Sequence, residues 1–431
     1  MLVLLTVLVV IASGRFRMDV TALSGLLILG IAGVAPPTII FSGFGHPALA
    51  TIIAVFFMSQ GIINSEALRG VGQILARKAR SLKSQVVSTA FVAAILSSLM
   101  NNVGTVGLMI PTVVRMAKRA GVKPGTFGLP LVMISILGGS VTLIGSAPNI
   151  IIASYMATAT GSSFKMFDYA PHGLAMLGIA LLVWIICKSC GIDPGSTGSE
   201  DNAKIEHKIN EEHDSTLKDS DSSNSNIEEN IHFAPLATKA RKITLISILL
   251  AIILVSFGLL HPVFGFGGVV LVMIYFGVLK LPDDFSSVDL KIVFFLGSML
   301  GIGQTLEHTG TLDLLAGYLT EFTAGFSPMA LIIVIIFLSS ALSNAINNSA
   351  AAVFMAPLAV GIAAGSSIGT AAALMAVAAG SNLALMLPTH QATLMVLSKA
   401  PFSLGSFLRF GAVLTLLCGM AAAMVIALIW Q

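Results

Sequence analysis

The sequence has few charged residues. Lys, Arg, Asp and Glu together make up 10% of the 431 residues, whereas 56% are hydrophobic. Soluble domains carry about 25% charged residues, so this shortage excludes a soluble globular protein. Apolar runs such as 244–260 and 411–430 recur along the whole chain, which predicts a polytopic membrane protein. The apolar run at 1–12 lacks a cleavage site of small residues, and we expect it to be a first span and not a signal peptide.

Cysteine and enzyme motifs are also scarce. Three cysteines provide no disulfide framework, and the Cys187–Cys190 CxxC has no second ligand pair, so no zinc site is expected. A net charge of +3 gives no indication of nucleic-acid binding. The chain lacks HExxH or paired aspartates on adjacent helices, the motifs that a membrane-embedded enzyme would need. We therefore expect a protein that is not an enzyme.

Acidic residues are unevenly distributed. The segment 192–238 holds 11 of the 20, while 84–160 and 322–431 contain none. This segment is too short and too polar to bury a core, which predicts a disordered linker. The linker divides the chain into two halves, 1–191 and 239–431.

The two halves share motifs, which indicates an internal repeat. A Ser, two adjacent Asn and a Pro occur with the same spacing in both halves, 246 residues apart. They are Ser97, Asn101, Asn102 and Pro111, then Ser343, Asn347, Asn348 and Pro357. Downstream, Gly139-Ser140 and Gly380-Ser381 each precede an apolar run broken by Gly or Pro, and we align these two pairs.

Five spans are expected in each half. Two further apolar segments, 82–114 and 328–362, are too long for one span, and we interpret each as a re-entrant hairpin. The expected spans are 2–13, 20–36, 47–63, 127–158, 171–189, 244–260, 265–279, 292–306, 371–398 and 411–430. The spans 127–158 and 371–398 contain the Gly/Pro breaks and are expected to be broken helices.

The basic residues predict the orientation in the membrane. With the linker in the cytoplasm, 22 of the 23 Lys and Arg residues lie on the cytoplasmic side and only Lys165 lies outside. An odd number of spans per half then makes the repeats inverted, with both chain ends outside. The predicted fold is an all-α polytopic protein of the cell (inner) membrane, built from two inverted repeats of five spans, each with a re-entrant hairpin and a broken helix.

Each Asn-Asn pair falls at the centre of a predicted hairpin. Irregular backbone at that depth is tolerated only inside protein or beside a cavity, and inverted repeats with broken helices are typical of secondary transporters. Helix N-termini at the tips would attract an anion, while carbonyl, Asn and Ser oxygens could bind Na⁺. A single Asn within the membrane more often forms a hydrogen bond between helices than part of a binding site. The repetition of the motif favours a binding site.

At these residues the chain resembles the divalent anion:sodium symporter (DASS) family of the ion transporter superfamily. The family's hairpin tips read Ser-Asn-Thr, where this chain has Asn101-Asn102-Val103 and Asn347-Asn348-Ser349. Its first break reads Gly-Thr-Pro-Pro-Asn, close to GSAPN at 145–149. Its second break ends in Thr-Pro-Thr-Asn, from which PTHQ at 388–391 departs.

The resemblance implies Na⁺-coupled symport of a small divalent anion, of the dicarboxylate or sulfate class, by an elevator-type homodimer in the lipid bilayer. The two Na⁺ sites would then comprise Ser97, Asn101, Asn102 and Gly145, and Ser343, Asn347, Asn348 and Pro388. The anion would lie between the tips, near Asn101, Asn102, Thr105, Ser146, Asn149, Asn347, Asn348, Ser349, Thr389 and His390.

The two regions without Asp or Glu, 84–160 and 322–431, give separate evidence on which ion is coupled to transport. A proton-coupled carrier normally keeps a carboxylate or a histidine at its site, and only His390 is available here, which favours Na⁺. A proton-coupled or arsenite-type carrier of the same superfamily stays open as an alternative. A non-transporting sensor, with the acidic linker as partner site, is an alternative of another class.

Overall fold

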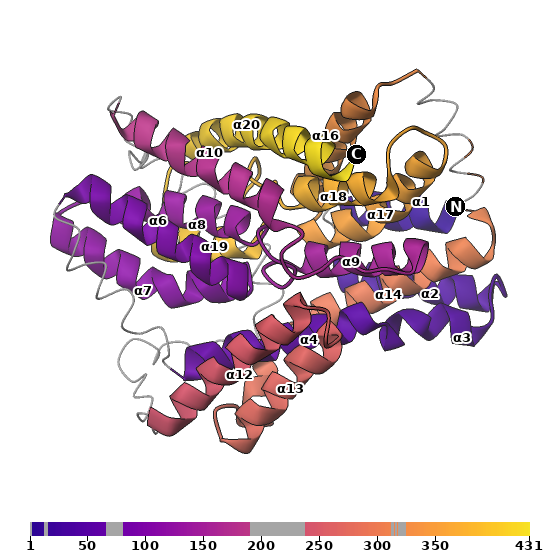
Figure 1. Cartoon of the computed structure of the whole chain (residues 1–431), viewed down its shortest axis with the longest axis horizontal. Helices are drawn as coiled ribbons and strands as arrows, with labels where there is room; N and C mark the ends of the chain where they lie inside the picture. The colour runs from indigo at the N-terminus through magenta and orange to yellow at the C-terminus, as the bar shows by residue number, and fades with distance from the viewer. Residues whose placement is uncertain are drawn as a thin grey trace.

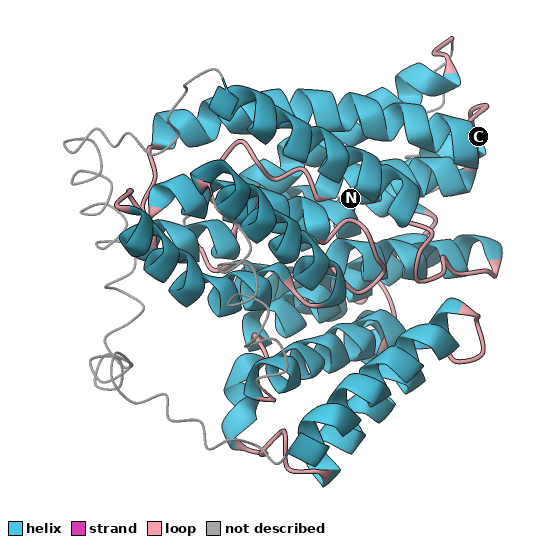
Figure 2. Ribbon diagram, turned by 60° about the vertical axis from the view of Figure 1, so that its left-hand side comes forward, coloured by secondary structure: helices cyan, strands magenta, loops and turns pink. Residues whose placement is uncertain are grey.

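The computed structural model describes residues 2–12, 16–65, 81–189, 238–311, 314, 317 and 325–431. Within these residues the regular structure is helical, with no strand (Figure 2). The predicted linker at 192–238 lies outside the described residues, except for Thr238, where a helix begins.

A helix, or a pair of helices, overlaps each predicted span, with ends that differ by up to seven residues. In the first half they are α1 (Leu2–Ala12), α2 (Met18–Ile31), α3 (Pro37–Ile40), the 3₁₀ helix η1 (Phe41–Gly45), α4 (Pro47–Asn64), α6 (Leu82–Leu99), α7 (Asn102–Ala120), α8 (Gly125–Gly138), α9 (Ala147–Thr160) and α10 (Ala170–Ser189). In the second half they are α12 (Thr238–Ser256), α13 (Pro262–Tyr275), η2 (Asp283–Ser287), α14 (Leu290–His308), α16 (Pro328–Ala345), α17 (Asn348–Ala364), α18 (Thr370–Ser381), α19 (Gln391–Lys399) and α20 (Leu404–Trp430).

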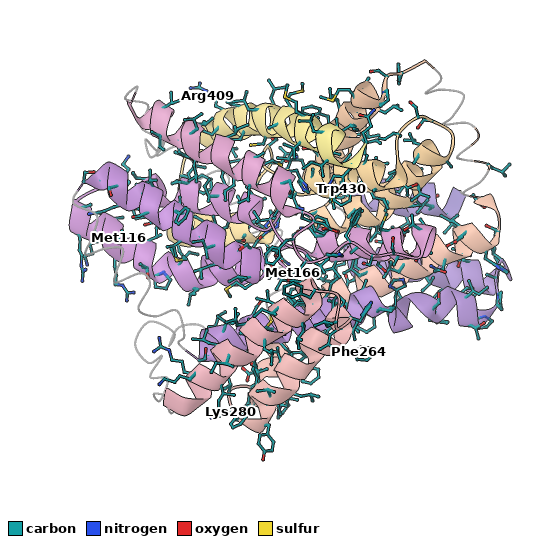
Figure 3. The ribbon with its side chains drawn as sticks, in the orientation of Figure 1. Met116, Met166, Phe264, Lys280, Arg409 and Trp430 are labelled. Atoms are coloured by element: carbon teal, nitrogen blue, oxygen red, sulfur yellow. The ribbon has the colours of Figure 1, made fainter. Side chains whose placement is uncertain are left out.

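Four stretches of the described residues are long and apolar enough to cross a membrane. They are Pro37–Asn64, Leu290–His308, Pro328–Ala345 and Leu404–Trp430, and several shorter apolar helices accompany them. Many large apolar side chains on these helices are exposed, as expected for surfaces that face lipid. Figure 3 shows Lys280 and Arg409, predicted to face the cytoplasm, toward the left, and Trp430, next to the chain end that is predicted to lie outside, toward the right.

Local caps explain where several helices begin. Ser81 and Ser327 accept backbone N–H bonds at the starts of α6 and α16. His46 and His261 do the same for α4 and α13 through Nδ1, and each is followed by a proline at the first helical position. The sequence pattern alone gives these two histidines no role.

The helices form two groups (Figure 1). The support bundle comprises α1–α4 and α12–α14, and the site bundle comprises α6–α10 and α16–α20. Each half of the sequence therefore contributes its first helices to one bundle and its later helices to the other. The main contacts between the bundles are those of α4 with α7 and α9, and of α14 with α17.

The site bundle contains the same helix pairings in both halves. Helix α6 packs on α8 as α16 packs on α18, and α7 packs on α8 as α17 packs on α18. The helices that follow the two breaks are exchanged, because α9 packs on α17 and α19 packs on α7. Each half therefore completes the surroundings of the other half's Asn-Asn pair.

The alignment of Gly139-Ser140 with Gly380-Ser381 is wrong. The Ser97 Oγ lies 2.6 Å from the Ser135 carbonyl oxygen, and the Ser343 Oγ lies 2.7 Å from that of Ser381. Ser381 is therefore equivalent to Ser135, again 246 residues away. The two Gly-Ser pairs differ because α8 continues to Gly138, whereas α18 ends at Ser381, so the second break starts earlier.

Candidate functional site

Four helices begin at one cavity of about 130 Å³. Helix α7 begins at Asn102 and α17 at Asn348, while α9 begins at Ala147 and α19 at Gln391. All four of these residues line the cavity. The positive dipole ends of four helices therefore meet at a single space, together with those first-turn N–H groups that no side chain caps.

The support bundle supplies an apolar wall for this cavity. Met18 comes from α2, Val55 and Phe56 from α4, and Ile292 and Phe295 from α14. Among the described residues, no Asp, Glu, Lys or Arg lines the cavity. The positive potential there must come from backbone groups, with His390 as the one titratable side chain in the lining.

The first hairpin tip is held by Asn101 and Asn102. The Asn101 Oδ1 accepts from the Val103 N–H at 3.2 Å and so caps α7. The backbone N–H of Asn101 donates to the Ser59 Oγ of α4 at 3.3 Å. Asn102 is buried, with its Oδ1 2.7 Å from the Ser97 Oγ. Because that hydroxyl also lies 2.6 Å from the Ser135 carbonyl, its single proton can serve only one of the two oxygens.

Two glycines bring further oxygens to the same place. A Cβ on Gly139 would lie 2.5 Å from the Asn102 Oδ1 and 2.9 Å from the Gly145 carbonyl oxygen, and a Cβ on Gly145 would lie 2.7 Å from the Gly139 oxygen and 2.8 Å from the Ser97 oxygen. Only glycine allows so close an approach. We call these atoms the first oxygen cluster: Ser97 Oγ and O, Asn102 Oδ1, and the carbonyls of Ser135, Gly139 and Gly145. Such neutral oxygens are ligands for a hard cation.

The second half repeats part of this arrangement. The Ser343 Oγ lies 3.0 Å from the Asn348 Oδ1 and 2.7 Å from the Ser381 carbonyl, and these atoms form the second oxygen cluster. The Asn347 Oδ1 caps α17 by accepting from the Ala350 N–H at 2.7 Å. The buried Asn348 Nδ2 has no hydrogen-bond partner, although Asn348 lines the cavity. A buried donor without a partner at a cavity wall is a candidate ligand for an anion.

Asn149 holds the first break in shape. Asn149 is fully buried. Its Nδ2 donates to the carbonyls of Gly139 at 3.2 Å and Thr142 at 2.8 Å. Its backbone carbonyl accepts from the Tyr169 hydroxyl. It does not line the cavity. Asn149 therefore fixes the loop that carries the Gly139 and Gly145 carbonyls of the first oxygen cluster, and the structure places it behind the expected anion site.

Asn344, which was not predicted, holds the second break. Its Oδ1 accepts from the N–H groups of Met386 and Leu387 at 2.8 and 3.0 Å, and its Nδ2 donates to the carbonyls of Ser340 and Leu383. Its carbonyl accepts from the Thr389 hydroxyl at 3.1 Å. A third asparagine in the apolar run, one helical turn before Asn348, was the available signal.

The predicted site residues fall into two sets. Those that line the cavity are Asn101, Asn102, Gly145, Ser146, Asn347, Asn348, Ser349, Thr389 and His390. Those that do not are Ser97, Thr105, Asn149, Ser343 and Pro388. Of these, Ser97 and Ser343 belong to the oxygen clusters, whereas Thr105 is fully buried in α7 with an unpartnered hydroxyl. His390 also caps α19, because its Nδ1 accepts from the Ala392 N–H at 3.1 Å.

A larger cavity of about 820 Å³ adjoins the site. It shares Asn101, Val103 and Gln391 with the smaller cavity, and Lys291 lies in its wall. The basic residues predict that Lys291 is on the cytoplasmic side. The shared walls make this larger cavity the candidate access route to the four helix N-termini.

Known proteins match the chain at several levels. A family model described as citrate transporter matches residues 7–380. An uncharacterized transporter of Mycobacterium tuberculosis is 27% identical over 440 aligned residues, covering 94% of this chain and 92% of the relative. An uncharacterized transporter of Synechocystis is 27% identical over 192 residues, 44% of this chain and 31% of that protein. The probable sodium/sulfate cotransporter 3 of Chlamydomonas reinhardtii is 30% identical over 151 residues, 33% of this chain and 17% of that protein. The matches to the last two span about a third or less of the relatives' length.

Two solved transporters have a similar fold. The YdaH transporter of Alcanivorax borkumensis superposes with a TM-score of 0.64 at 13% identity, covering 94% of this chain and 88% of that one. MtrF of Neisseria gonorrhoeae superposes with a TM-score of 0.59 at 14% identity, covering 90% and 82%. At such identities the likeness concerns the fold alone. Together with the apolar helices, the family match identifies a multi-pass membrane protein: the chain belongs to the citrate transporter (CitMHS) family of the ion transporter superfamily.

Proposed function

We propose that this transporter carries a small divalent anion, of the dicarboxylate or sulfate class, together with Na⁺. The observation that carries the proposal is the convergence of four helix N-termini on one cavity, with an oxygen cluster directly behind each Asn-Asn tip. Free N–H groups and dipole ends favour an anion, and among the residues that the structure describes no acidic side chain lines the cavity to repel one. The cavity of about 130 Å³ has room for about four waters, a size that suits a compact anion.

The oxygen clusters support Na⁺ as the co-transported ion. Their ligands would be neutral hydroxyl, amide and carbonyl oxygens, which suit a hard cation. No carboxylate occurs in 84–160 or 322–431 to carry a proton. Relatives named sodium/sulfate cotransporters favour the same ion. We also propose that, within the superfamily, this chain is a divalent anion:sodium symporter of the DASS type.

The two tip asparagines would couple the cation to the anion. In each, the Oδ1 belongs to an oxygen cluster and the same residue lines the cavity. A cation on the Asn348 Oδ1 would hold the amide so that its unpartnered Nδ2 is available to the anion. The anion would then bind more tightly when the cation is present, and by linkage the cation would bind more tightly with the anion.

The arrangement in two bundles supports an elevator-type mechanism. The site bundle would move against the support bundle, whose apolar side chains from α2, α4 and α14 form the wall of the cavity. The proposal also includes inverted repeats, with both chain ends outside. The support bundle would pair with that of a second copy to form a homodimer. The larger cavity beside Lys291 would make the present conformation open to the cytoplasm.

One observation favours a second candidate, coupling to protons. His390 lines the cavity and is its one titratable side chain among the described residues. A proton there would add one positive charge beside the anion. This candidate predicts transport without Na⁺ and loss of that transport when His390 is replaced.

The proposed substrate class is tested by uptake into proteoliposomes. Purified protein is given radiolabelled sulfate, a four-carbon dicarboxylate or citrate, each with an inward Na⁺ gradient, and Asn102→Ala serves as the inactive control. We expect uptake of sulfate or of the dicarboxylate. Uptake of none of these anions, with a folded protein in the liposomes, would contradict the proposal, and uptake of citrate alone would move the substrate to the tricarboxylates.

A further inference from the structure

Asn382 lies where the two halves of the site bundle meet. It follows Ser381, the last residue of α18, and it is fully buried. It was not among the predicted site residues, and it does not line the cavity. Any role in transport must therefore be exerted through its neighbours.

The Asn382 amide joins the second half to the first break. Its Nδ2 donates to the Asn149 Oδ1 at 2.9 Å, and its Oδ1 accepts from the Ser146 hydroxyl at 2.6 Å. The Nδ2 also donates to the Ala378 carbonyl within α18 at 2.9 Å. All three bonds are buried, so none of these groups can exchange its partner for water without a cost.

Two partners of Asn382, Asn149 and Ser146, and the residue before it in the chain each lead directly to one part of the site. Asn149 donates to the Gly139 carbonyl of the first oxygen cluster. The preceding residue, Ser381, contributes its carbonyl to the second oxygen cluster. Ser146 lines the cavity at the start of α9, next to the Gly145 carbonyl. One side chain thus stands between both clusters and the cavity.

We propose that Asn382 is a positioning residue that couples the two cation sites, so that Na⁺ binding at one promotes Na⁺ binding at the other. The inference rests on the proposed function and adds to it a source of cooperativity. A cation at the first cluster would draw the Gly139 carbonyl toward itself and thereby fix Asn149. Asn149 and Ser146 together then hold the Asn382 amide, and with it the peptide that carries the Ser381 carbonyl. The second cluster would be arranged for its cation before that cation arrives.

The chain offers a matched set of variants. Asn382→Leu removes all three bonds at similar volume, and Asn382→Ser keeps a hydroxyl that cannot span both partners. Thr415→Val is the control, because Thr415 is buried in α20 with an unpartnered hydroxyl and lies outside the site. Asn149→Ala removes the acceptor of the Asn382–Asn149 hydrogen bond and so breaks that bond from the first half.

The experiment measures anion uptake by full-length protein in proteoliposomes as a function of Na⁺ concentration. We expect a Hill coefficient near two for the wild type and for Thr415→Val, and near one for Asn382→Leu and Asn382→Ser. Asn149→Ala should lower it as well, and the double variant Asn149→Ala/Asn382→Ser should lower it no further, because both variants break the Asn149–Asn382 hydrogen bond. For a variant that is folded but inactive, the cooperativity of Na⁺ binding is measured by the rise in its melting temperature.

The outcomes separate this inference from the proposed function. Cooperative Na⁺ dependence that persists unchanged in a folded Asn382→Ser protein would overturn the coupling role and leave Na⁺ symport intact. A wild type whose uptake does not depend on Na⁺ would overturn the proposed function and the coupling role with it.

Discussion

Replacing Gly139 with alanine places a methyl group inside the first oxygen cluster. Gly139 has φ −61° and ψ −21°, a backbone conformation that alanine adopts freely, so the substitution changes only the available space. The new Cβ would lie 2.5 Å from the Asn102 Oδ1 and 2.9 Å from the Gly145 carbonyl oxygen. Both distances are well below an ordinary carbon–oxygen contact, so the cluster must open.

The size of the effect follows from this crowding. Inserting a methyl group into a packed site costs about 1–3 kcal/mol. If the cluster opens to relieve that strain, a cation that binds there must close it again and restore the strain. The cation's binding free energy is then weaker by the same amount, which corresponds to about a 5- to 150-fold loss of cation affinity. We therefore expect the Na⁺ concentration for half-maximal uptake to rise by at least about fivefold in Gly139→Ala.

The assay is uptake against Na⁺ concentration in proteoliposomes, with Gly178→Ala as the control. A Cβ on Gly178, in α10, would meet no atom within 4 Å, so this variant should behave as the wild type. An unchanged Na⁺ dependence in a folded Gly139→Ala protein would show that the first oxygen cluster does not bind the coupling ion.

Three further predictions concern the asparagines and the histidine of the site. Asn102→Ala and Asn348→Ala should each abolish uptake while the proteins still insert in the membrane, and normal uptake by either would remove that tip from the site. Asn344→Ala should lower the melting temperature in detergent, because the N–H groups of Met386 and Leu387 in the second break lose their acceptor, at about 1 kcal/mol for each lost hydrogen bond; an unchanged midpoint would exclude this role. His390→Gln should change substrate preference or pH dependence more than Na⁺ dependence, measured by uptake at pH 6 and pH 8, and the reverse pattern would speak for a cation-binding histidine.

The sequence predicts helices and helix starts better than it predicts loop geometry. The apolar runs indicate the helices because their length and composition are local properties. The Asn-Asn pairs indicate where α7 and α17 begin, since an asparagine ahead of a helix caps it. The aligned Ser97 and Ser343 lie in equivalent contacts with their tip asparagines.

The residues that were not predicted act through contacts between distant segments. Gly139 belongs to the first cluster because a tip asparagine from another helix approaches its Cα, and one glycine among many in a membrane protein carries no such signal. Asn382 joins residues more than 200 positions away, at Ser146 and Asn149. Asn149 was expected to contact the anion, but its hydrogen bonds run along the break, away from the cavity. Only the folded structure, within each half and between the halves, reveals these roles.

The central claim is that Na⁺ drives the entry of an anion into the cavity where the four helices begin. The most direct measurement is uptake of the accepted anion into proteoliposomes in sodium buffer against choline buffer, each at pH 6 and pH 8, for the wild type and His390→Gln. We expect uptake in sodium at both pH values and little uptake in choline. Full uptake in choline at pH 6 that disappears in His390→Gln would contradict it and identify the proton as the coupling ion.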